Sequence, residues 1–135
     1  MSMDRDTLEA LVLGCPFHRF LGLELLAFDA EAGSVTLGLP LREEFSRQDG
    51  AVELHGGITA ALIDIAGDYA VAVRIGRGVP TVDLRVDYLK MGRGERITAE
   101  ARAVRLGRSI GTVDVEVRDA QETLIAIGRG KYSTA

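Results

Sequence analysis

The 135-residue sequence predicts one α+β domain spanning residues 1–135, in which an antiparallel sheet wraps around a single long helix. Two features of the sequence predict this class. Residues 58–73 form a nearly unbroken apolar run with the length of a buried helix. Segments on both sides of that run alternate apolar and polar residues, which is the period of a strand that buries one face. Because only one long helix is available, the simplest two-layer fold packs the sheet around it.

The first part of the chain predicts a short helix and two strands. An amphipathic helix is expected over 4–13, and Gly14 and Pro16 end it. Residues 17–22 are apolar without a regular period, so they are expected to be irregular. The next segments are two strands and a polar loop, at 23–30, 34–40 and 42–53.

Four strands are expected after the long helix, at 81–89, 97–104, 110–118 and 123–132. The first of them carries Val82, Leu84, Val86 and Tyr88 in phase. Short turns rich in glycine or acidic residues separate the four segments. The predicted order is therefore helix, two strands, long helix, four strands.

Composition and charge exclude several classes of protein. A net charge of −4 and a sequence pI near 5.2 argue against general nucleic-acid binding. The apolar run is short for a membrane span and is interrupted by Asp64 and Asp68. The N-terminal residues lack the apolar stretch of a signal peptide, and the single Cys15 fits a reducing compartment. A cytoplasmic protein is expected, with no metal and no cofactor, because His18 and His55 are too few for a metal site.

Asp64 stands in the middle of the apolar helix, and Asp68 follows one turn later on the same face. A buried carboxylate must be paired, hydrogen-bonded or protonated, and such groups concentrate at functional sites. Asp64 is therefore the candidate catalytic acid. For Asp68 a purely structural or solvent-facing role is favoured. A further possibility is that the strip carrying both acids becomes enclosed when two subunits meet.

His55-Gly56-Gly57 directly precedes the apolar helix. No Ser, Thr, Asp or Asn stands immediately before Ile58 to cap the helix, so its first N–H groups are expected to be open. Glycines let another group approach the backbone closely, and the helix dipole favours negative charge here. The turn is thus a candidate site for a carbonyl oxygen or oxyanion. His55 is also a candidate, although a histidine in this position more often bonds nearby backbone and fixes the turn.

The run from Leu54 to Asp64, LHGGITAALID, resembles the signature of hotdog-fold thioesterases. It is most similar to phenylacetate-pathway thioesterases and the mammalian acyl-CoA thioesterase superfamily member 2. The similarity extends over essentially the whole chain, through Phe20-Leu21-Gly22, Thr81-Val82-Asp83-Leu84 and Gly107-Arg108-Ser109. It implies a hotdog fold, hydrolysis of an acyl-CoA, and a homodimer or dimer of dimers with active sites between subunits.

The resemblance also implies roles for single residues. Asp64 matches the catalytic acid, which acts as nucleophile or as general base for water. The Gly56 N–H of the neighbouring subunit matches the group that polarises the thioester carbonyl. Thr81 falls where a hydroxyl helps to place the attacking water. The family often has an asparagine six residues before the histidine, but here Asp49 occupies that position and cannot donate an amide hydrogen bond.

Further substrate contacts are expected around these groups. Gln48 can take the role of the missing asparagine if the loop shifts. The expected contacts with CoA or the acyl chain are Gly57, Lys90, Arg93, Arg105, Arg108 and Ser109. For each basic residue, ordinary surface charge is an equally good interpretation. Three aromatic residues, Phe17, Phe20 and Phe45, hint at an aryl or medium-chain acyl group.

Two other functions stay open at this point. A hotdog hydratase acting on enoyl or hydroxyacyl thioesters would use a catalytic histidine paired with an acid, which His55 does not obviously provide. A non-catalytic acyl-CoA-binding protein is the other alternative, and Asp49 is the residue that favours it.

Overall fold

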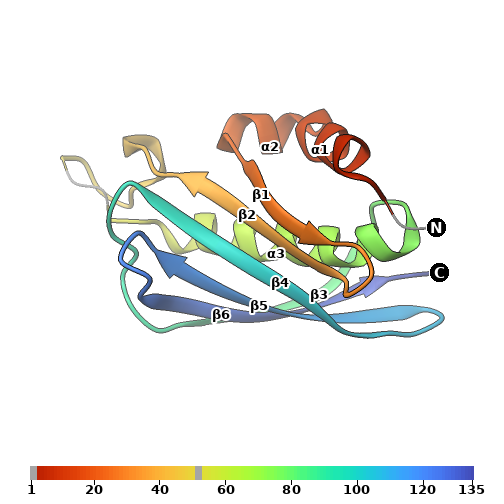
Figure 1. The fold of residues 1–135 in the computed structure, drawn as a ribbon. Coiled ribbons are helices and arrows are strands. Elements are labelled where there is room, and N and C mark those ends of the chain that lie inside the picture. The colour runs from red at the N-terminus through yellow and green to blue at the C-terminus, as the bar shows by residue number, and fades with distance from the viewer. Residues whose placement is uncertain (1–2, 51–52) are drawn as a thin grey trace.

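The computed structural model describes residues 3–50 and 53–135, and its central feature is a six-stranded antiparallel sheet curved around one long helix (Figure 1). This is the predicted hotdog architecture. In chain order the elements are α1 (Arg5–Gly14), α2 (Pro16–Leu21), β1 (Glu24–Asp29), β2 (Ser34–Pro40), the 3-10 turn η1 (Glu43–Phe45), α3 (Gly56–Ile75), β3 (Thr81–Tyr88), β4 (Arg96–Leu106), β5 (Ile110–Asp119) and β6 (Leu124–Ser133). The strands lie within two residues of their predicted bounds.

The strand order across the sheet is β1-β2-β4-β5-β6-β3. β4, β5 and β6 follow one another as hairpins, whereas α3 separates β2 from β3 and carries the chain to the opposite edge. The two edges differ. At β1, the Arg5 guanidinium donates to the Leu25 carbonyl (2.9 Å) and a bulge follows Leu25. β3 has no such cover within the described residues, so its outer backbone groups are available to another strand.

The core lies between α3 and the concave face of the sheet. Tyr132 of β6 is fully buried there, and its ring occupies the space that side chains at Gly67 and Gly130 would fill. A Cβ atom built on Gly130 would lie 2.5 Å from the Tyr132 ring, so this position requires glycine. These glycines let the tyrosine reach the middle of α3.

Three sequence predictions need correction. Residues 17–22 are not irregular, because Pro16 starts the helix α2 and Gly22, in a left-handed conformation, ends it with its N–H on the carbonyls of His18 and Arg19. The long helix begins at Gly56 rather than Ile58, so the glycine turn is its first turn. On β3, Val82 is 59% exposed and lies at the bulge between Thr81 and Asp83, which interrupts the alternation there, and Tyr88 is 56% exposed at the other end of the strand.

None of the helices in the described residues has both the length and the apolar character that crossing a membrane requires. The predicted loop over 42–53 contains η1 and an isolated bridge between Ser46 and Leu54. Residues 51 and 52 of that loop lie outside the described residues.

Candidate functional site

Asp64 and Thr81, seventeen positions apart in sequence, meet where α3 lies beside the start of β3. The Thr81 hydroxyl donates to Asp64 Oδ1 at 2.7 Å. Asp64 is half-buried and Thr81 is exposed. Among the described residues, Thr81 is the side chain that donates to this carboxylate, and the second oxygen accepts no hydrogen bond.

The acids lie on a strip of α3 that the rest of the chain does not cover. Its members follow each other at helical spacing and escape full burial: Gly57, Ala60, Ala61, Asp64 and Asp68. The helix is thus less completely buried than its apolar sequence predicts. The small side chains at the start of the strip leave a smooth surface that a second element can approach closely.

Tyr132 supports the turn of α3 that carries Asp64. Its hydroxyl donates to the Asp64 carbonyl oxygen at 2.9 Å. Burial raises the pKa of the Tyr132 phenol, and the charges of Asp64 and Asp68 raise it further, so the hydroxyl stays a donor. No sequence motif singled out this residue. The signal was the pair of glycines, Gly67 and Gly130, whose missing side chains make room for it.

His18 is a second residue that the sequence analysis did not place at the site. It is buried on α2, with Nδ1 2.9 Å from the Val12 carbonyl oxygen and its ring edge against Tyr69. Burial lowers the pKa of His18, while the Val12 carbonyl and the charge of Asp64 oppose that shift. The ring contact with Tyr69, 5.7 Å between centroids, is what places α2 against α3.

Asp68 faces the segment that leads into β3. Its Oδ1 accepts a hydrogen bond from the Val79 N–H at 3.0 Å. Burial raises the pKa of the Asp68 carboxyl from 3.8 to about 6; the Val79 N–H opposes this shift and the charge of Asp64 adds to it. Asp68 is therefore not a free surface acid, and no arginine of the described residues pairs with it.

Asp68→Asn is expected to stabilise the protein at pH 8 and to change little at pH 4. Because the folded carboxyl has a raised pKa, its favourable contribution is complete below about pH 4 and is lost as the pH rises through about 6. At pH 8 the ionised group lowers the free energy of unfolding by up to about 3 kcal/mol, a cost that an asparagine avoids. Urea unfolding at both pH values measures this. Equal differences at pH 4 and pH 8 would contradict it.

The first turn of α3 is capped, contrary to the sequence prediction. His55 is the N-cap, and its Nδ1 accepts a hydrogen bond from the Gly57 N–H at 2.9 Å. This occupies the Gly57 amide and gives His55 the structural role of fixing the turn. The contact with backbone is the one expected of a structural His55, but the Gly57 amide was expected to be open because no Ser, Thr, Asp or Asn precedes the helix.

Gly56 keeps its N–H without an acceptor in the described part of the chain. Its carbonyl accepts from the Tyr88 hydroxyl at 2.7 Å, and the Tyr88 ring lies 3.3 Å from the position of a Gly56 Cβ. The end of β3 is thereby tied to the start of α3. The Gly57 and Ile58 amides both donate to His55, so within the described residues the Gly56 amide is the first-turn donor that stays open.

A cleft of about 360 Å³ opens beside this turn. Its lining includes Gly56, Thr59 and Tyr88, together with the basic residues Arg47 and Lys90. Of the cations that the sequence analysis proposed for CoA, Lys90 alone lines this cleft. Arg47 was not proposed; it forms an ion pair with Glu53 at 2.9 Å.

The remaining proposed substrate contacts fall into two groups at opposite ends of the sheet. Arg93 precedes β4 near Lys90, whereas Arg105, Arg108 and Ser109 lie at the β4–β5 hairpin. β4 has 11 residues, so the two groups are about 30 Å apart along the strand. One chain alone does not bring them together.

Asp64 and Gly56 are likewise apart in one chain. They are eight residues apart on the same helix, which corresponds to about 12 Å along its axis. A single thioester carbonyl cannot touch both groups of one protomer.

Comparison with known proteins decides the family. The sequence model of the thioesterase superfamily matches residues 53–126, from just before the His-Gly-Gly turn to β6. The chain belongs to the thioesterase superfamily. Among curated relatives, the medium/long-chain acyl-CoA thioesterase YigI of Escherichia coli is 30% identical over 92% of this chain and 88% of its own length.

Solved structures agree with this assignment. One thioesterase-superfamily protein shares 37% identity with a TM-score of 0.89, covering 95% of this chain and 96% of its own. A thioesterase from Haemophilus influenzae has 27% identity and a TM-score of 0.84, covering 98% and 92%. The chain is accordingly a thioesterase, an enzyme that hydrolyses thioesters.

Gln48 and Asp49 of this thioesterase are exposed in the loop before α3. Neither side chain is hydrogen-bonded to Asp64 or His55 in the described residues. The loop is joined to the start of α3 by a backbone hydrogen bond, in which the His55 N–H donates to the Phe45 carbonyl oxygen (2.8 Å). Within one protomer, then, Asp49 does not join the acid that it was predicted to influence.

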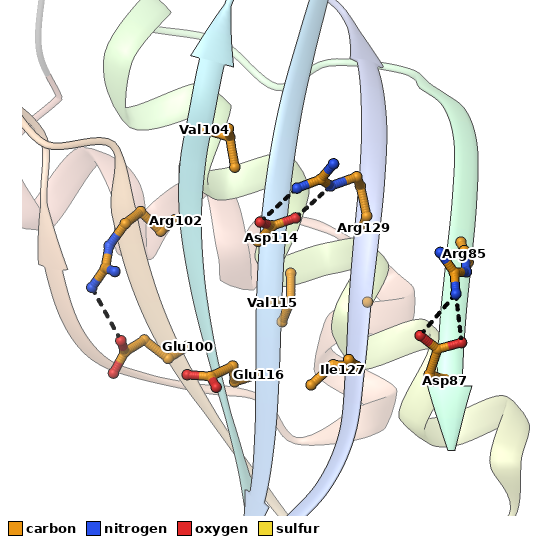
Figure 2. Close-up of a pocket in the computed structure, with 11 residues that line it drawn as sticks. Arg85, Asp87, Glu100, Arg102, Val104, Asp114, Val115, Glu116, Ile127 and Arg129 are labelled. Carbon is orange, nitrogen blue, oxygen red and sulfur yellow. Dashed lines mark hydrogen bonds and ion pairs between the residues drawn. The ribbon is translucent and has the colours of Figure 1, made fainter. Parts of the chain in front are cut away.

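A second hollow of this thioesterase, about 460 Å³, lies on the outer face of the sheet, away from α3 (Figure 2). Charged side chains line it, and most are paired with each other: Asp114 with Arg129 at 2.6 Å, Arg85 with Asp87, and Glu100 with Arg102. The sheet separates this hollow from Asp64. It is therefore not a second opening of the candidate active site.

Proposed function

We propose that this thioesterase hydrolyses an acyl-CoA with an aryl or medium-chain acyl group, using Asp64 of one protomer and the Gly56 N–H of its partner. The observation that carries the proposal is the placement of the two groups at opposite ends of one open edge strand. Thr81 at the start of β3 bonds Asp64, and Tyr88 at its end bonds Gly56. An antiparallel pair of two β3 strands would set the start of one beside the end of the other.

Charge favours one register for this pair. If the two-fold axis passes through Leu84, each Arg85 lies opposite Asp83 of the partner subunit, which gives two ion pairs. If the axis passes through Arg85, two arginines oppose each other. The Leu84 register also sets Thr81, and with it Asp64, beside the partner's Asp87 and Tyr88. The partner's Gly56 lies next to that tyrosine.

The proposed chemistry uses few groups. The partner's Gly56 N–H donates to the thioester carbonyl oxygen and stabilises the negative charge that develops there. The Asp64 carboxylate attacks the carbonyl carbon, or takes a proton from water while that water attacks. If Asp64 attacks, the C–S bond breaks to leave a mixed anhydride on Asp64, which water then hydrolyses to the free acid while Asp64 is regenerated as the carboxylate. If water attacks, the C–S bond breaks to give the free acid directly, and the proton that Asp64 took from water passes to the CoA sulfur. In both routes the sulfur leaves as a thiolate that is protonated to CoA thiol, by Asp64 or by the water consumed. Thr81 orients Asp64, while His55 is left to cap α3, which argues against a hydratase that needs it as the catalytic histidine.

The same dimer would gather the proposed CoA contacts. β3 runs antiparallel to β4, so the end of the sheet near Asp64 also carries Arg105, Arg108 and Ser109. Lys90 and Arg93 lie at the Gly56 end. Pairing two protomers head to tail would bring the first group of one beside the second group of the other, where both can meet CoA phosphates. Gln48 and Asp49 stay predictions at this boundary.

The acyl group is proposed to lie along α2. Phe17 and Phe20 are 48% and 57% exposed and stack on each other at 6.5 Å between ring centres. Phe20 also meets the buried Phe45, and the Arg42 guanidinium lies over both rings. His18, between the two exposed phenylalanines in sequence, interacts with Asp64. An apolar or aryl chain leaving the carbonyl toward α2 would cover these rings.

A dimer of dimers is proposed through the outer face of the sheet (Figure 2). Like charges lie directly opposite each other there on neighbouring strands, Glu100 beside Glu116 and Arg85 beside Arg129. Such pairs are unfavourable in an isolated sheet. A second dimer presenting the opposite charges would offset them. The cytoplasm is the proposed compartment, in line with the single cysteine.

The direct test is a substrate panel. We expect the purified protein to release free CoA from aryl- and medium-chain acyl-CoA, measured as thiol production, and Asp64→Ala to release almost none. Thioesters of short acyl chains serve as the comparison, since they cannot reach the rings on α2. Hydrolysis of no member of the panel by the wild type would contradict the proposed substrate class.

The proposed dimer register predicts a disulfide. In a Cys15→Ser background, Leu84→Cys is expected to cross-link on oxidation, because opposite residues of an antiparallel pair have Cα atoms about 5 Å apart. Val86→Cys is the matched control. Val86 points to the same side of the strand as Leu84, but in this register the two Val86 residues are four positions apart along the paired strands. Non-reducing electrophoresis reads out the result. Equal cross-linking of both variants, or of neither, would contradict this register.

A further inference from the structure

Two acids of α3, Asp68 and Asp64, accept hydrogen bonds from nearby residues of the segment that leads into β3. Asp68 Oδ1 accepts from the Val79 N–H at 3.0 Å, and Asp64 Oδ1 accepts from the Thr81 hydroxyl at 2.7 Å. Between them, the Pro80 carbonyl accepts from the Ser133 N–H at 2.9 Å. Pro80 itself has no N–H to donate. The Val79 amide is therefore the backbone donor that fixes this segment to the helix.

The Asp68–Val79 and Asp64–Thr81 hydrogen bonds lie close together, so a shift in one is expected to move the other. Val79 is 7% exposed, and Asp68 lies one helical turn beyond Asp64 on the same strip. A displacement of the Val79 amide moves Thr81, two residues later, relative to Asp64. Hydrogen bonds accepted by an ionised carboxylate are roughly twice as strong as neutral ones. The charge of Asp68 therefore strengthens its hydrogen bond with the Val79 N–H.

We propose that Asp68 is a positioning residue for thioester hydrolysis: its carboxylate holds the Val79 amide, and through it keeps the Thr81 hydroxyl on Asp64. This inference rests on the proposed function, in which Asp64 reacts with or activates water toward the thioester. It assigns a role to an acid for which the sequence favoured a purely structural one.

The surroundings of Asp68 make its hydrogen bond with the Val79 N–H sensitive to pH. The titratable groups that interact with it are Asp64 and Tyr69 on α3 and Tyr132 on β6, and none of these three carries positive charge. Burial among them raises its pKa to about 6. Below that pH the carboxyl is neutral and its bond to the Val79 amide weakens.

The test is the pH profile of kcat/KM for Asp68→Asn between pH 5 and pH 9. The amide can still accept from Val79, but as a neutral group at every pH. We expect activity roughly five- to tenfold below wild type at pH 8 and equal to wild type near pH 5, where Asp68 is itself protonated. Asp114→Asn, on the outer face of the sheet, is the control and should follow the wild-type profile.

Stability separates this role from a merely structural one. Asp68→Asn is expected to be more stable than wild type at pH 8 and yet less active, whereas loss of a structural contact would lower both. A double-mutant cycle with Thr81→Val adds a second readout. If Asp68 acts through Thr81, Asp68→Asn should cause no further loss in the Thr81→Val background.

Each outcome has one meaning. Losses that multiply in the double variant, or an Asp68→Asn profile that matches wild type at all pH values, would overturn the positioning role while leaving the proposed function intact. Wild-type turnover by Asp64→Ala would instead overturn the proposed function. The two failures are therefore distinguishable in one set of variants.

Discussion

Asp64→Asn is expected to lower kcat on acyl-CoA by roughly a hundredfold or more, because an amide can neither attack the carbonyl nor accept a proton from water. The substitution keeps the shape of the side chain. Its amide oxygen can still accept from the Thr81 hydroxyl, as Asp64 Oδ1 does at 2.7 Å, so the contact between α3 and β3 should survive. The loss would then report chemistry rather than folding.

Two controls sharpen this result. Thr81→Val removes the hydroxyl at nearly constant volume and should cost less than Asp64→Asn, because it only disturbs the orientation of the acid. Thermal unfolding of both variants should stay close to wild type. Near-wild-type turnover by Asp64→Asn on every substrate that the wild type hydrolyses would show that another group carries the reaction.

The fold was predictable because its signals were strong and mutually consistent. The single long apolar run has the length of a buried helix, which predicts a central helix. Val113, Val115 and Val117 alternate with polar residues, which predicts the buried side of a strand. The short helix α2 was missed because six residues are too few to display a helical period, and its evidence lies in the caps Pro16 and Gly22.

The site was predictable in part. Asp64 and Thr81 were named from the sequence, and the structure brings them within hydrogen-bond distance. Tyr132, His18 and the contact between Asp68 and Val79 were not, because tertiary packing of distant segments creates them. The cap by His55 agrees with the structural role that the sequence favoured for this residue, whereas the expectation of open first-turn amides was wrong for Gly57, which donates to His55.

Gly56→Pro is expected to lower kcat by about a hundred- to a thousandfold, the usual cost of removing one oxyanion donor. Proline replaces the N–H with its ring, and the first position of a helix tolerates it. The residue before it must be extended, and His55 already has φ −65° and ψ 133°. Gly56→Ala is the matched control. It places a comparable Cβ 3.3 Å from the Tyr88 ring but keeps the amide, so its loss should be far smaller.

Mixing Asp64→Asn with Gly56→Pro tests whether the two groups belong to different protomers. If each site takes its acid from one subunit and its amide from the other, a mixed dimer has one site with both defects and one with neither. Co-expressed or refolded mixtures should then recover activity that each parent lacks, up to about a quarter of wild type at equal ratio, since half of the dimers are mixed and each has one intact site. If both groups came from the same chain, every site would keep one defect. The mixture would then stay inactive, an outcome that the separation of about 12 Å along α3 between Asp64 and Gly56 of one chain argues against.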